Sequence, residues 1–448
     1  MSKSVDPNDA IVPSMGAEAQ EARLLLQEQP PAVPTTPAVA QPPLRSLVML
    51  SMLYFLAGVS SSTFGRFSAV FYLSKNLGAF QIAVIESVQP ALRTVFSPLW
   101  GIVSDRLLGK KLTFVIAKVF STCLLCCLAI GPLTDRFYKI LLVVMAASCF
   151  SAGSVVDAYA LELCGGSSRK LYGRLRLWLA VSWGVGSAAM GAIATANNDD
   201  WTWNFVLYGA FGATTVVFTM LCLPLRTPEE EQRHAENNAP PGSRKRTVTI
   251  SEVLCTGPFF ALLLKAITLG VSLAALERLM FVFLRRDLNG SALLCGITVL
   301  VTVVFEIPVF WFSSTIFDVL QPRAMMTIAL LAFIVRVYGY TLLTESTRWY
   351  ILFCEVLHGL TYGLMWLTIV DGVKTVSPVG WTGTVQSIVG VAYSCVGSGV
   401  SALIGGYVMD TYGCRDYFIG MCFVVSVVLI VHWIVWGVDA WCRSSKEH

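Results

Sequence analysis

Charged residues are scarce in this sequence. Of its 448 residues only 13% are Asp, Glu, Lys or Arg, while 55% are hydrophobic, and the mean hydropathy is +0.67. A soluble domain carries roughly 25% charged residues. A chain of this length with so little charge cannot cover itself with polar surface, so most of its outside must face lipid. The composition therefore excludes a soluble globular protein and predicts a polytopic membrane protein.

Several motifs are also missing. The sequence has no phosphate-binding loop, which excludes an ATP-driven pump. No positive segment followed by an apolar core sits at Met1, so we expect no cleavable signal peptide. Cys123, Cys126 and Cys127 lie in an apolar run without His or carboxylate nearby. We interpret them as small buried hydrophobes, with a metal site as the alternative. We expect no metal, no cofactor, no enzymatic activity and no nucleic-acid partner.

The first 44 residues differ from the rest of the chain. They are rich in Pro, Ala, Gln and Ser and have no apolar periodicity, so we predict a disordered cytoplasmic tail over 1–44. Within it, Glu21 followed by Leu25 and Leu26 fits an acidic dileucine sorting pattern, which also arises by chance. The pattern leaves both the plasma membrane and an endolysosomal or vacuolar membrane open.

From Leu47 onward, apolar runs of roughly 20–27 residues recur, each long enough to cross about 30 Å of hydrocarbon at 1.5 Å per residue. The first six end at Arg226, a polar segment follows, and six more complete the chain. This order implies two bundles related as a repeat, with a path between them. We predict an all-α protein with twelve spans at about 47–73, 80–103, 112–132, 137–163, 173–195, 203–224, 258–284, 291–312, 324–344, 348–372, 381–408 and 416–440.

These spans divide the chain into parts. We predict an N-terminal six-helix bundle over 45–226, a cytoplasmic linker over 227–251, a C-terminal six-helix bundle over 252–441 and a cytoplasmic tail over 442–448. The basic residues near the span ends favour cytoplasmic termini. With that orientation 17 of them lie inside, namely Arg45, Arg106, Lys110, Lys111, Arg169, Lys170, Arg174, Arg176, Arg226, Arg233, Arg244, Lys245, Arg246, Arg323, Lys374, Arg443 and Lys446. Only 7 lie outside: Lys75, Arg136, Lys139, Arg285, Arg286, Arg348 and Arg415.

The most specific motif joins the second and third spans and reads Gly101-Ile-Val-Ser-Asp105-Arg106-Leu-Leu-Gly109-Lys110-Lys111. It resembles the signature of the major facilitator superfamily, Gly-x-x-x-Asp-Arg-x-Gly-Arg-Arg, with one extra residue before the second glycine. A glycine at 101 permits close helix packing, and a carboxylate at 105 can pair with cations and a neighbouring helix N-terminus. The basic residues would hold the loop on the cytoplasmic side.

The resemblance implies that these residues form a conformational latch between the bundles, which breaks as a transporter turns inward. The alternative is an ordinary basic loop. The matching loop of the second half, 311–323, keeps only Asp318 and Arg323, which puts its own latch role in doubt. The predicted latch consists of Gly101, Asp105, Arg106, Gly109, Lys110 and Lys111.

Further stretches resemble the branch of the superfamily that includes lactose permease and the major-facilitator-associated domains. They lie at 172–186, 306–310, 355–363 and 405–413. This resemblance implies a secondary transporter that carries a small polar organic solute, such as a sugar, nucleoside or carboxylate, by alternating access. We expect a monomer in the lipid bilayer, with protons as the coupling ion. The alternative is a receptor or scaffold that keeps the fold without transporting.

Ionisable residues inside the spans are the candidate site residues, because such a group in hydrocarbon costs several kcal/mol unless it is paired or hydrated. Arg66, Arg93 and Arg336 fall near mid-span, and they favour an anionic solute slightly. Glu86 and Arg93 are seven residues apart, hence on one helical face that suits the lining of a cavity. Glu277 lies nearer a span end, where an interfacial position explains it equally well.

The tenth span carries the sharpest pattern, since Glu355, His358, Tyr362 and Trp366 form one stripe along a helix. A carboxylate and a histidine one turn apart can relay a proton, although both can also serve local packing. Lactose permease carries a His and a Glu one turn apart on this span in the opposite order, and an arginine on the ninth span that Arg336 resembles. The aromatic pair either stacks on a ring-bearing solute or packs in the core. The predicted substrate or proton pathway comprises Arg66, Glu86, Arg93, Glu306, Arg336, Glu355, His358, Tyr362 and Trp366.

Overall fold

The computed structural model describes residues 44–151, 153–163, 169–227, 230–231, 256–377 and 382–447. The predicted tail up to residue 43, with its dileucine pattern, lies outside the described residues. Most of the predicted linker, 232–251, lies outside them too, and the limits of the linker stay a prediction.

The described residues form helices and contain no strand. In the first half these are α2 (Leu44–Phe64), α3 (Ser68–Ser74), α4 (Ala79–Val103), η1 (Ser104–Leu108), α5 (Lys110–Cys126), η2 (Cys127–Ala129), η3 (Gly131–Leu133), α6 (Phe137–Cys149), α7 (Gly153–Leu163), α8 (Arg169–Ala196) and α9 (Thr202–Cys222). In the second half they are α12 (Gly257–Leu273), η4 (Ala274–Leu279), α13 (Met280–Arg286), α14 (Ala292–Trp311), α15 (Ser313–Val319), α16 (Pro322–Thr341), η5 (Arg348–Tyr350), α17 (Ile351–Glu355), η6 (Gly359–Gly363), α18 (Leu364–Val376), α19 (Thr382–Val391), η7 (Ala392–Gly399), α20 (Val400–Thr411) and α21 (Cys414–Glu447).

The spans agree with the sequence prediction. Within the described ranges, 11 helices are long and apolar enough to cross a membrane, and each coincides with a predicted span. The remaining predicted span, 80–103, is α4, a helix of 25 residues. It is not among the 11, and it carries Glu86 and Arg93 besides Pro90 and Pro98. The prediction of an all-helical polytopic membrane protein is confirmed.

Three spans of the second half contain a π-helical turn: η4 in the seventh, η6 in the tenth and η7 in the eleventh. Such turns are rare and occur frequently at functional sites, because they shift the phase of the side chains that follow. The turn η6 lies against α14 so closely that a Cβ added at Gly359 would sit 2.1 Å from the carbonyl oxygen of Phe305. The sequence prediction treated these spans as continuous helices and did not foresee the turns.

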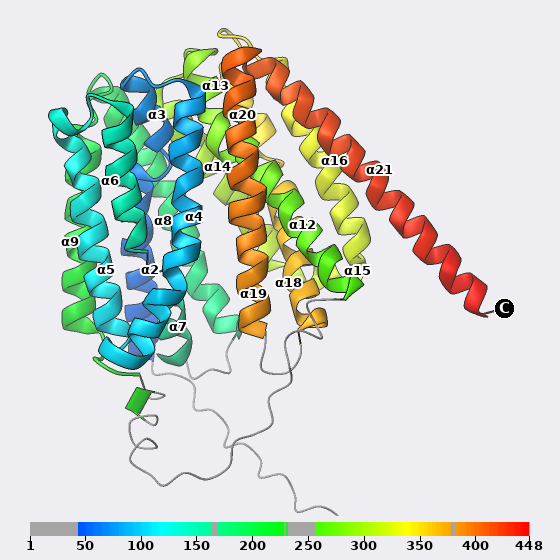
Figure 1. Ribbon diagram of the computed structural model, residues 1–448, viewed down its shortest axis with the longest axis horizontal. Coiled ribbons are helices and arrows are strands. Elements are labelled where there is room, and N and C mark those ends of the chain that lie inside the picture. The colour runs from blue at the N-terminus through cyan, green and yellow to red at the C-terminus, as the bar shows by residue number, and fades with distance from the viewer. Residues whose placement is uncertain are drawn as a thin grey trace, which may run out of the picture. The chain divides into compact units, whose positions relative to one another are not determined.

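The two halves meet along two seams, α8 against α14 and α4 against α20. The first seam is tight: a Cβ at Gly191 would lie 2.4 Å from the carbonyl oxygen of Ala292, and one at Gly296 would lie 2.3 Å from that of Ser187. Small residues permit such backbone approach in membrane proteins. We call the face at which α4 begins and α20 ends the distal face, drawn at the top of Figure 1, and the opposite face the proximal face.

Candidate functional site

The deepest polar cluster of the described molecule surrounds Arg336 on α16. Its side chain is 1% exposed and forms an ion pair with Glu355, at the end of α17, whose side chain is also 1% exposed. The remaining nitrogens of the guanidinium are engaged as well. Nε donates to the Tyr340 hydroxyl at 2.9 Å, and Nη1 donates to Thr361 Oγ1 at 3.1 Å and lies 2.9 Å from His358 Nδ1. Tyr340 in turn donates to the second oxygen of Glu355. Every polar group of this cluster therefore has a partner, as a charge buried in a membrane protein requires.

Local sequence explains part of this geometry. Arg336 and Tyr340 are four residues apart on α16 and share one face, so both reach the same carboxylate. Glu355 and His358 follow each other by three residues just before η6. Glu355 is the carboxylate that pairs with Arg336. Glu306 on α14 instead has a carboxylate oxygen 3.8 Å from His358 Nε2.

The contact with Arg336 fixes the tautomer of His358. A guanidinium has only donors, so the Nδ1 atom it approaches must accept. The proton of a neutral imidazole then sits on Nε2, the nitrogen that faces Glu306. His358 is thus held between a cation on one side and a carboxylate on the other.

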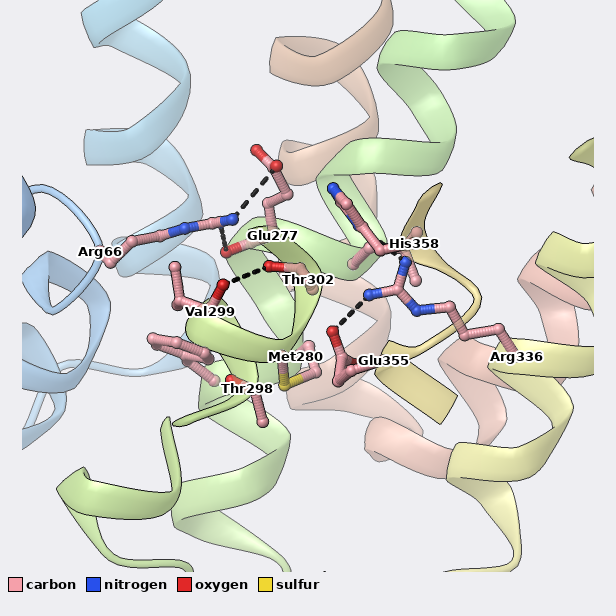
Figure 2. Close-up of a pocket in the computed structure, with 11 residues that line it drawn as sticks. Arg66, Glu277, Met280, Thr298, Val299, Thr302, Arg336, Glu355 and His358 are labelled. Atoms are coloured by element: carbon pink, nitrogen blue, oxygen red, sulfur yellow. Dashed lines mark hydrogen bonds and ion pairs between the residues drawn. The ribbon is translucent and has the colours of Figure 1, made fainter. Parts of the chain in front are cut away.

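A small cavity joins this cluster to the other half of the molecule. Its free space is about 10 Å³, room for about one water molecule. Figure 2 shows Arg66 entering from the first half toward Glu277, with Arg336, Glu355 and His358 on the opposite side. The wall between them consists of Leu276, Met280, Phe281, Thr298, Val299 and Thr302.

Arg66 and Glu277 form the cross-half contact of this cavity. Arg66 lies just after α2, and its Nη1 donates to the backbone oxygen of Glu277 at 3.1 Å, while Nη2 lies 3.2 Å from the Glu277 carboxylate. The guanidinium also lies over the ring of Trp183, 6.0 Å from its centre. Because Glu277 belongs to η4, the π-helical turn places its carbonyl toward the first half. From its sequence position, Glu277 fits an interfacial or a functional role; in the structure it lines the cavity.

The aromatic part of the predicted stripe is a stack. The rings of His358 and Tyr362 are 5.5 Å apart at 26°, those of Tyr362 and Trp366 are 6.0 Å apart at 24°, and Tyr393 lies edge-on to Trp366. The stack runs from the cavity along η6 and α18 toward the proximal face. Tyr362, Trp366 and Tyr393 are partly buried against the core.

Other predicted residues are not brought to this cavity. Glu86 on α4 is 7% exposed and accepts a hydrogen bond of 2.6 Å from Ser68 Oγ. Arg93 is exposed and lies 3.5 Å from Gln89 Oε1. Neither residue lines the cavity of Arg66 and Arg336. A cation that the sequence argument missed, Lys118 on α5, donates to Ser60 Oγ at 3.0 Å; a lone lysine inside an apolar run was the signal for it.

The predicted latch lies at the proximal face, where its lysines contact the first half and Glu230 of the predicted linker. Lys110 Nζ is 2.9 Å from Glu162, and its backbone N–H donates to Glu230 at 2.9 Å. Lys111 Nζ donates to the carbonyl oxygens of Met220 and Leu223, at 2.9 and 2.7 Å, at the end of α9. A cation at a helix C-terminus stabilises it. The two lysines thus fasten this loop to its own half.

The other latch residues differ from one another. Gly109 has φ of +78°, a conformation that favours glycine. Gly101 does not serve close packing, because no atom lies within 4 Å of a Cβ added there; the expectation for this residue is wrong. Arg106 is exposed, and the side chain of Asp105 lies outside the described residues.

A helical membrane protein built of two halves, with a buried ion pair in the second half and partly exposed ion pairs where the halves meet, is consistent with a transporter. The sequence agrees with the family model of the MFS_1 like family over residues 47–420. The chain belongs to this family.

Individual proteins support the same class. The chain is 24% identical over 356 residues to the "Uncharacterized transporter YwbF" of Bacillus subtilis (strain 168), covering 76% of this chain and 81% of that one. A crystal structure of the nucleoside transporter NupG superposes with a TM-score of 0.64 at 16% identity, covering 87% and 98% of the two chains. A POT family transporter in complex with 5-aminolevulinic acid gives 0.66 at 13% identity, covering 87% and 96%. The protein is a multi-span membrane transporter of the major facilitator type and not an enzyme.

Proposed function

We propose that this protein is a proton-coupled secondary transporter of a small polar organic solute, working by alternating access. The observation that carries the proposal is the buried pair of Arg336 and Glu355 with His358 bound to the same guanidinium. Ionisable residues kept inside a membrane domain mark ion and proton pathways. A receptor that never moved its halves would have no need of a titratable histidine at this depth.

The tautomer of His358 supports a coupling step. A second proton on the imidazole must go to Nδ1, the atom that now accepts from Arg336. Protonation would end that hydrogen bond and place two cations side by side, while Glu306 on the far side of the ring supplies the counter-charge. Because a like charge at such a distance disfavours the protonated form, proton binding and rearrangement of Arg336 are linked. Each proton would thereby change the contacts of α16 with η6.

Alternating access agrees with the size of the cavity. Pockets for small ligands measure about 300–1,000 Å³, whereas the space between Arg66 and Arg336 is about 10 Å³. Solute entry therefore requires the halves to separate, and the contact between Arg66 and Glu277 crosses the line of separation.

The chemistry of the cavity favours a hydrogen-bonding solute over a free carboxylate. The mid-span arginines slightly favour an anionic solute, but Arg66 and Arg336 each face a carboxylate. Threonine hydroxyls line the wall, and the stack of Tyr362 and Trp366 offers ring faces. Nucleosides and sugars fit this combination, and the structurally similar NupG is a nucleoside transporter.

We further propose that both termini and the linker are cytoplasmic, so that the proximal face is the cytoplasmic one, and that the protein works as a monomer. The bias of 17 basic residues against 7 supports this orientation. An impermeant reagent should label a tag at 227–251 only after permeabilisation of cells that carry the protein in the plasma membrane. Labelling of that tag in intact cells would contradict the orientation.

The direct test is uptake into proteoliposomes. Radiolabelled nucleosides, hexoses and small carboxylates are offered with and without a pH gradient, with empty liposomes as the blank. We expect uptake of a member of the first two classes that accumulates only when the gradient is present. Uptake that ignores the gradient would remove proton coupling, and uptake of carboxylates alone would overturn the substrate class.

A further inference from the structure

A second ionic cluster lies away from the cavity, at the distal face. Asp410, near the end of α20 in the second half, accepts from two backbone N–H groups of the first half. Its Oδ1 lies 3.0 Å from the nitrogen of Ala79 and its Oδ2 lies 2.7 Å from that of Phe80, the first two residues of α4. Arg286, at the end of α13, binds the same carboxylate with Nη1 at 3.0 Å. Figure 1 shows these ends of α4, α20 and α13 next to one another at the top of the molecule.

Physical chemistry makes this a specific contact. The first N–H groups of a helix lack partners within the helix, and the partial positive charge there attracts a carboxylate. A charged acceptor normally comes from the same chain segment, as an N-cap. Here the preceding residue is Gly78, whose added Cβ would lie 2.9 Å from Asp410 Oδ2. A side chain at this position would occupy the place of the carboxylate, so the cap of α4 comes from the other half of the molecule.

Two further cross-half contacts lie close by at the same face. Arg285 forms an ion pair with Asp199, which follows α8. The backbone N–H of Leu293 donates to Thr195 Oγ1 at 2.8 Å. At the seam of α4 with α20, Gly406 approaches α4 so closely that an added Cβ would lie 2.7 Å from the carbonyl oxygen of Ala79. The distal ends of both seams are thus joined by polar contacts as well as by packing.

We propose that Asp410 is the positioning residue that holds the distal face closed, by tying the N-terminus of α4 to Arg286. This role of Asp410 rests on the alternating access proposed above, because release of Asp410 from α4 is then a step in opening the distal face. Asp410 contacts neither the cavity nor the cluster of Arg336. It acts on the equilibrium between closed and open distal faces and leaves the solute site unchanged.

Hydrogen–deuterium exchange of the purified full-length protein tests the proposal without any solute or proton gradient. The amides of Ala79 and Phe80 report the cap itself, and the amide of Leu293, bound to Thr195, reports closure of the other seam. The amide of Leu294, bound to Ser291 Oγ within the second half, is an internal reference. In Asp410→Ala we expect the first two amides to exchange about fivefold faster, the usual effect of losing an N-cap. We also expect faster exchange at Leu293, with Leu294 unchanged.

The control is Asp416→Asn, in the first turn of α21 at the same face. Asp416 is exposed and has no hydrogen bond or ion pair to the first half among the described residues, so exchange should equal that of the parent. Faster exchange confined to Ala79 and Phe80 would make Asp410 a local cap and overturn the proposal, as would no change at all. If Asp410→Ala does not fold, Asp410→Asn removes the charge with little change in shape and is judged by the same amides. These measurements need no transport. An exchange result that contradicts the role of Asp410 would therefore leave the proposed function standing, and an uptake result that contradicts the proposed function would leave the exchange result standing.

Discussion

The cavity contains two arginine–carboxylate pairs that differ in burial and in what they connect. Arg336 and Glu355 lie within the second half, with side chains 1% exposed on both sides. Arg66 and Glu277 join the two halves, and their side chains are 13% and 33% exposed. In the first pair, the guanidinium of Arg336 also donates hydrogen bonds to the hydroxyls of Tyr340 and Thr361. The second has an Nε atom that is buried without a hydrogen-bond partner.

This difference separates two functions. A pair that is fully desolvated and saturated with hydrogen bonds cannot be broken cheaply, because a lone charge would remain in the membrane interior. It changes state by taking up or losing a proton. A pair that is partly hydrated and crosses between rigid halves can open as the halves separate, since water replaces the lost partner. Under the proposed function, the inner pair would carry proton coupling and the cross-half pair conformational exchange.

The largest effect is expected for Arg336→Ala. The change leaves Glu355 buried without its counter-charge, and breaking a buried pair in this way costs about 3–5 kcal/mol. The thermal midpoint of the purified protein should fall sharply, and expression should fall with it. Arg136→Ala, which removes an exposed arginine just before α6, is the matched control and should stay near the parent.

A double variant sharpens this prediction. Adding Glu355→Gln to Arg336→Ala removes the orphaned charge, so part of the stability should return. Adding Glu306→Gln instead should return less, because Glu306 contacts His358 and not Arg336. Equal rescue by both changes would show that Arg336 does not distinguish the two carboxylates.

The next effect concerns coupling. Glu355→Gln and His358→Gln should each abolish the dependence of uptake on a pH gradient. Exchange of labelled for unlabelled solute at equilibrium should persist, because it needs no net proton movement. Glu355→Gln keeps the shape of the side chain and one acceptor for Tyr340. Gradient-driven accumulation equal to the parent in both variants would place the proton site elsewhere, with half-buried Glu306 and buried Glu86 as the next carboxylates to test.

A smaller effect on stability is expected for Arg66→Gln and for Glu277→Gln. Partly exposed pairs contribute about 0–1 kcal/mol, so the thermal midpoint should move little. Transport should nevertheless change, because the closed cavity loses a contact that the open states lack. The exchanged pair Arg66→Glu with Glu277→Arg should recover part of the parental rate if the ionic contact matters, whereas the single reversals should be slower than either neutral variant.

The sequence predicted those parts of the site that depend on one helix. The stripe of Glu355, His358, Tyr362 and Trp366 has helical spacing. Its three rings form a stack, and its carboxylate belongs to the buried pair beside that stack. Contacts between different helices were harder to predict from the sequence. The partner of Arg66 depends on how η4 turns its carbonyl toward the first half, and π-helical turns have no reliable signal in a single sequence.

Polar contacts between distant segments were missed for the same reason. Asp410 was part of a stretch quoted for its family resemblance, but nothing in its neighbourhood indicates that it caps α4, 330 residues away. Gly78 was a local indication of such a contact. A glycine before a helix has no side chain to cap it, so another side chain can bind the first N–H groups. Gly101 shows the opposite error, because a motif glycine was expected to pack closely and faces open space.

The smallest effect on stability is expected for Asp105→Asn in the signature loop. It can be compared with Lys111→Met in the same motif. Lys111 binds the last carbonyls of α9 in the first half, so its loss should lower the thermal midpoint modestly and act on folding. Asp105 lies in η1, just after α4, where partners from the second half exist in only one conformation if the latch is real. Asp105→Asn should then leave expression and membrane insertion near normal while slowing transport. The comparison is decisive because the two changes remove charges six residues apart in one loop. Normal transport in Asp105→Asn, or its loss through misfolding, would reject the latch; slow transport with an unchanged thermal midpoint would assign the loop to the cycle.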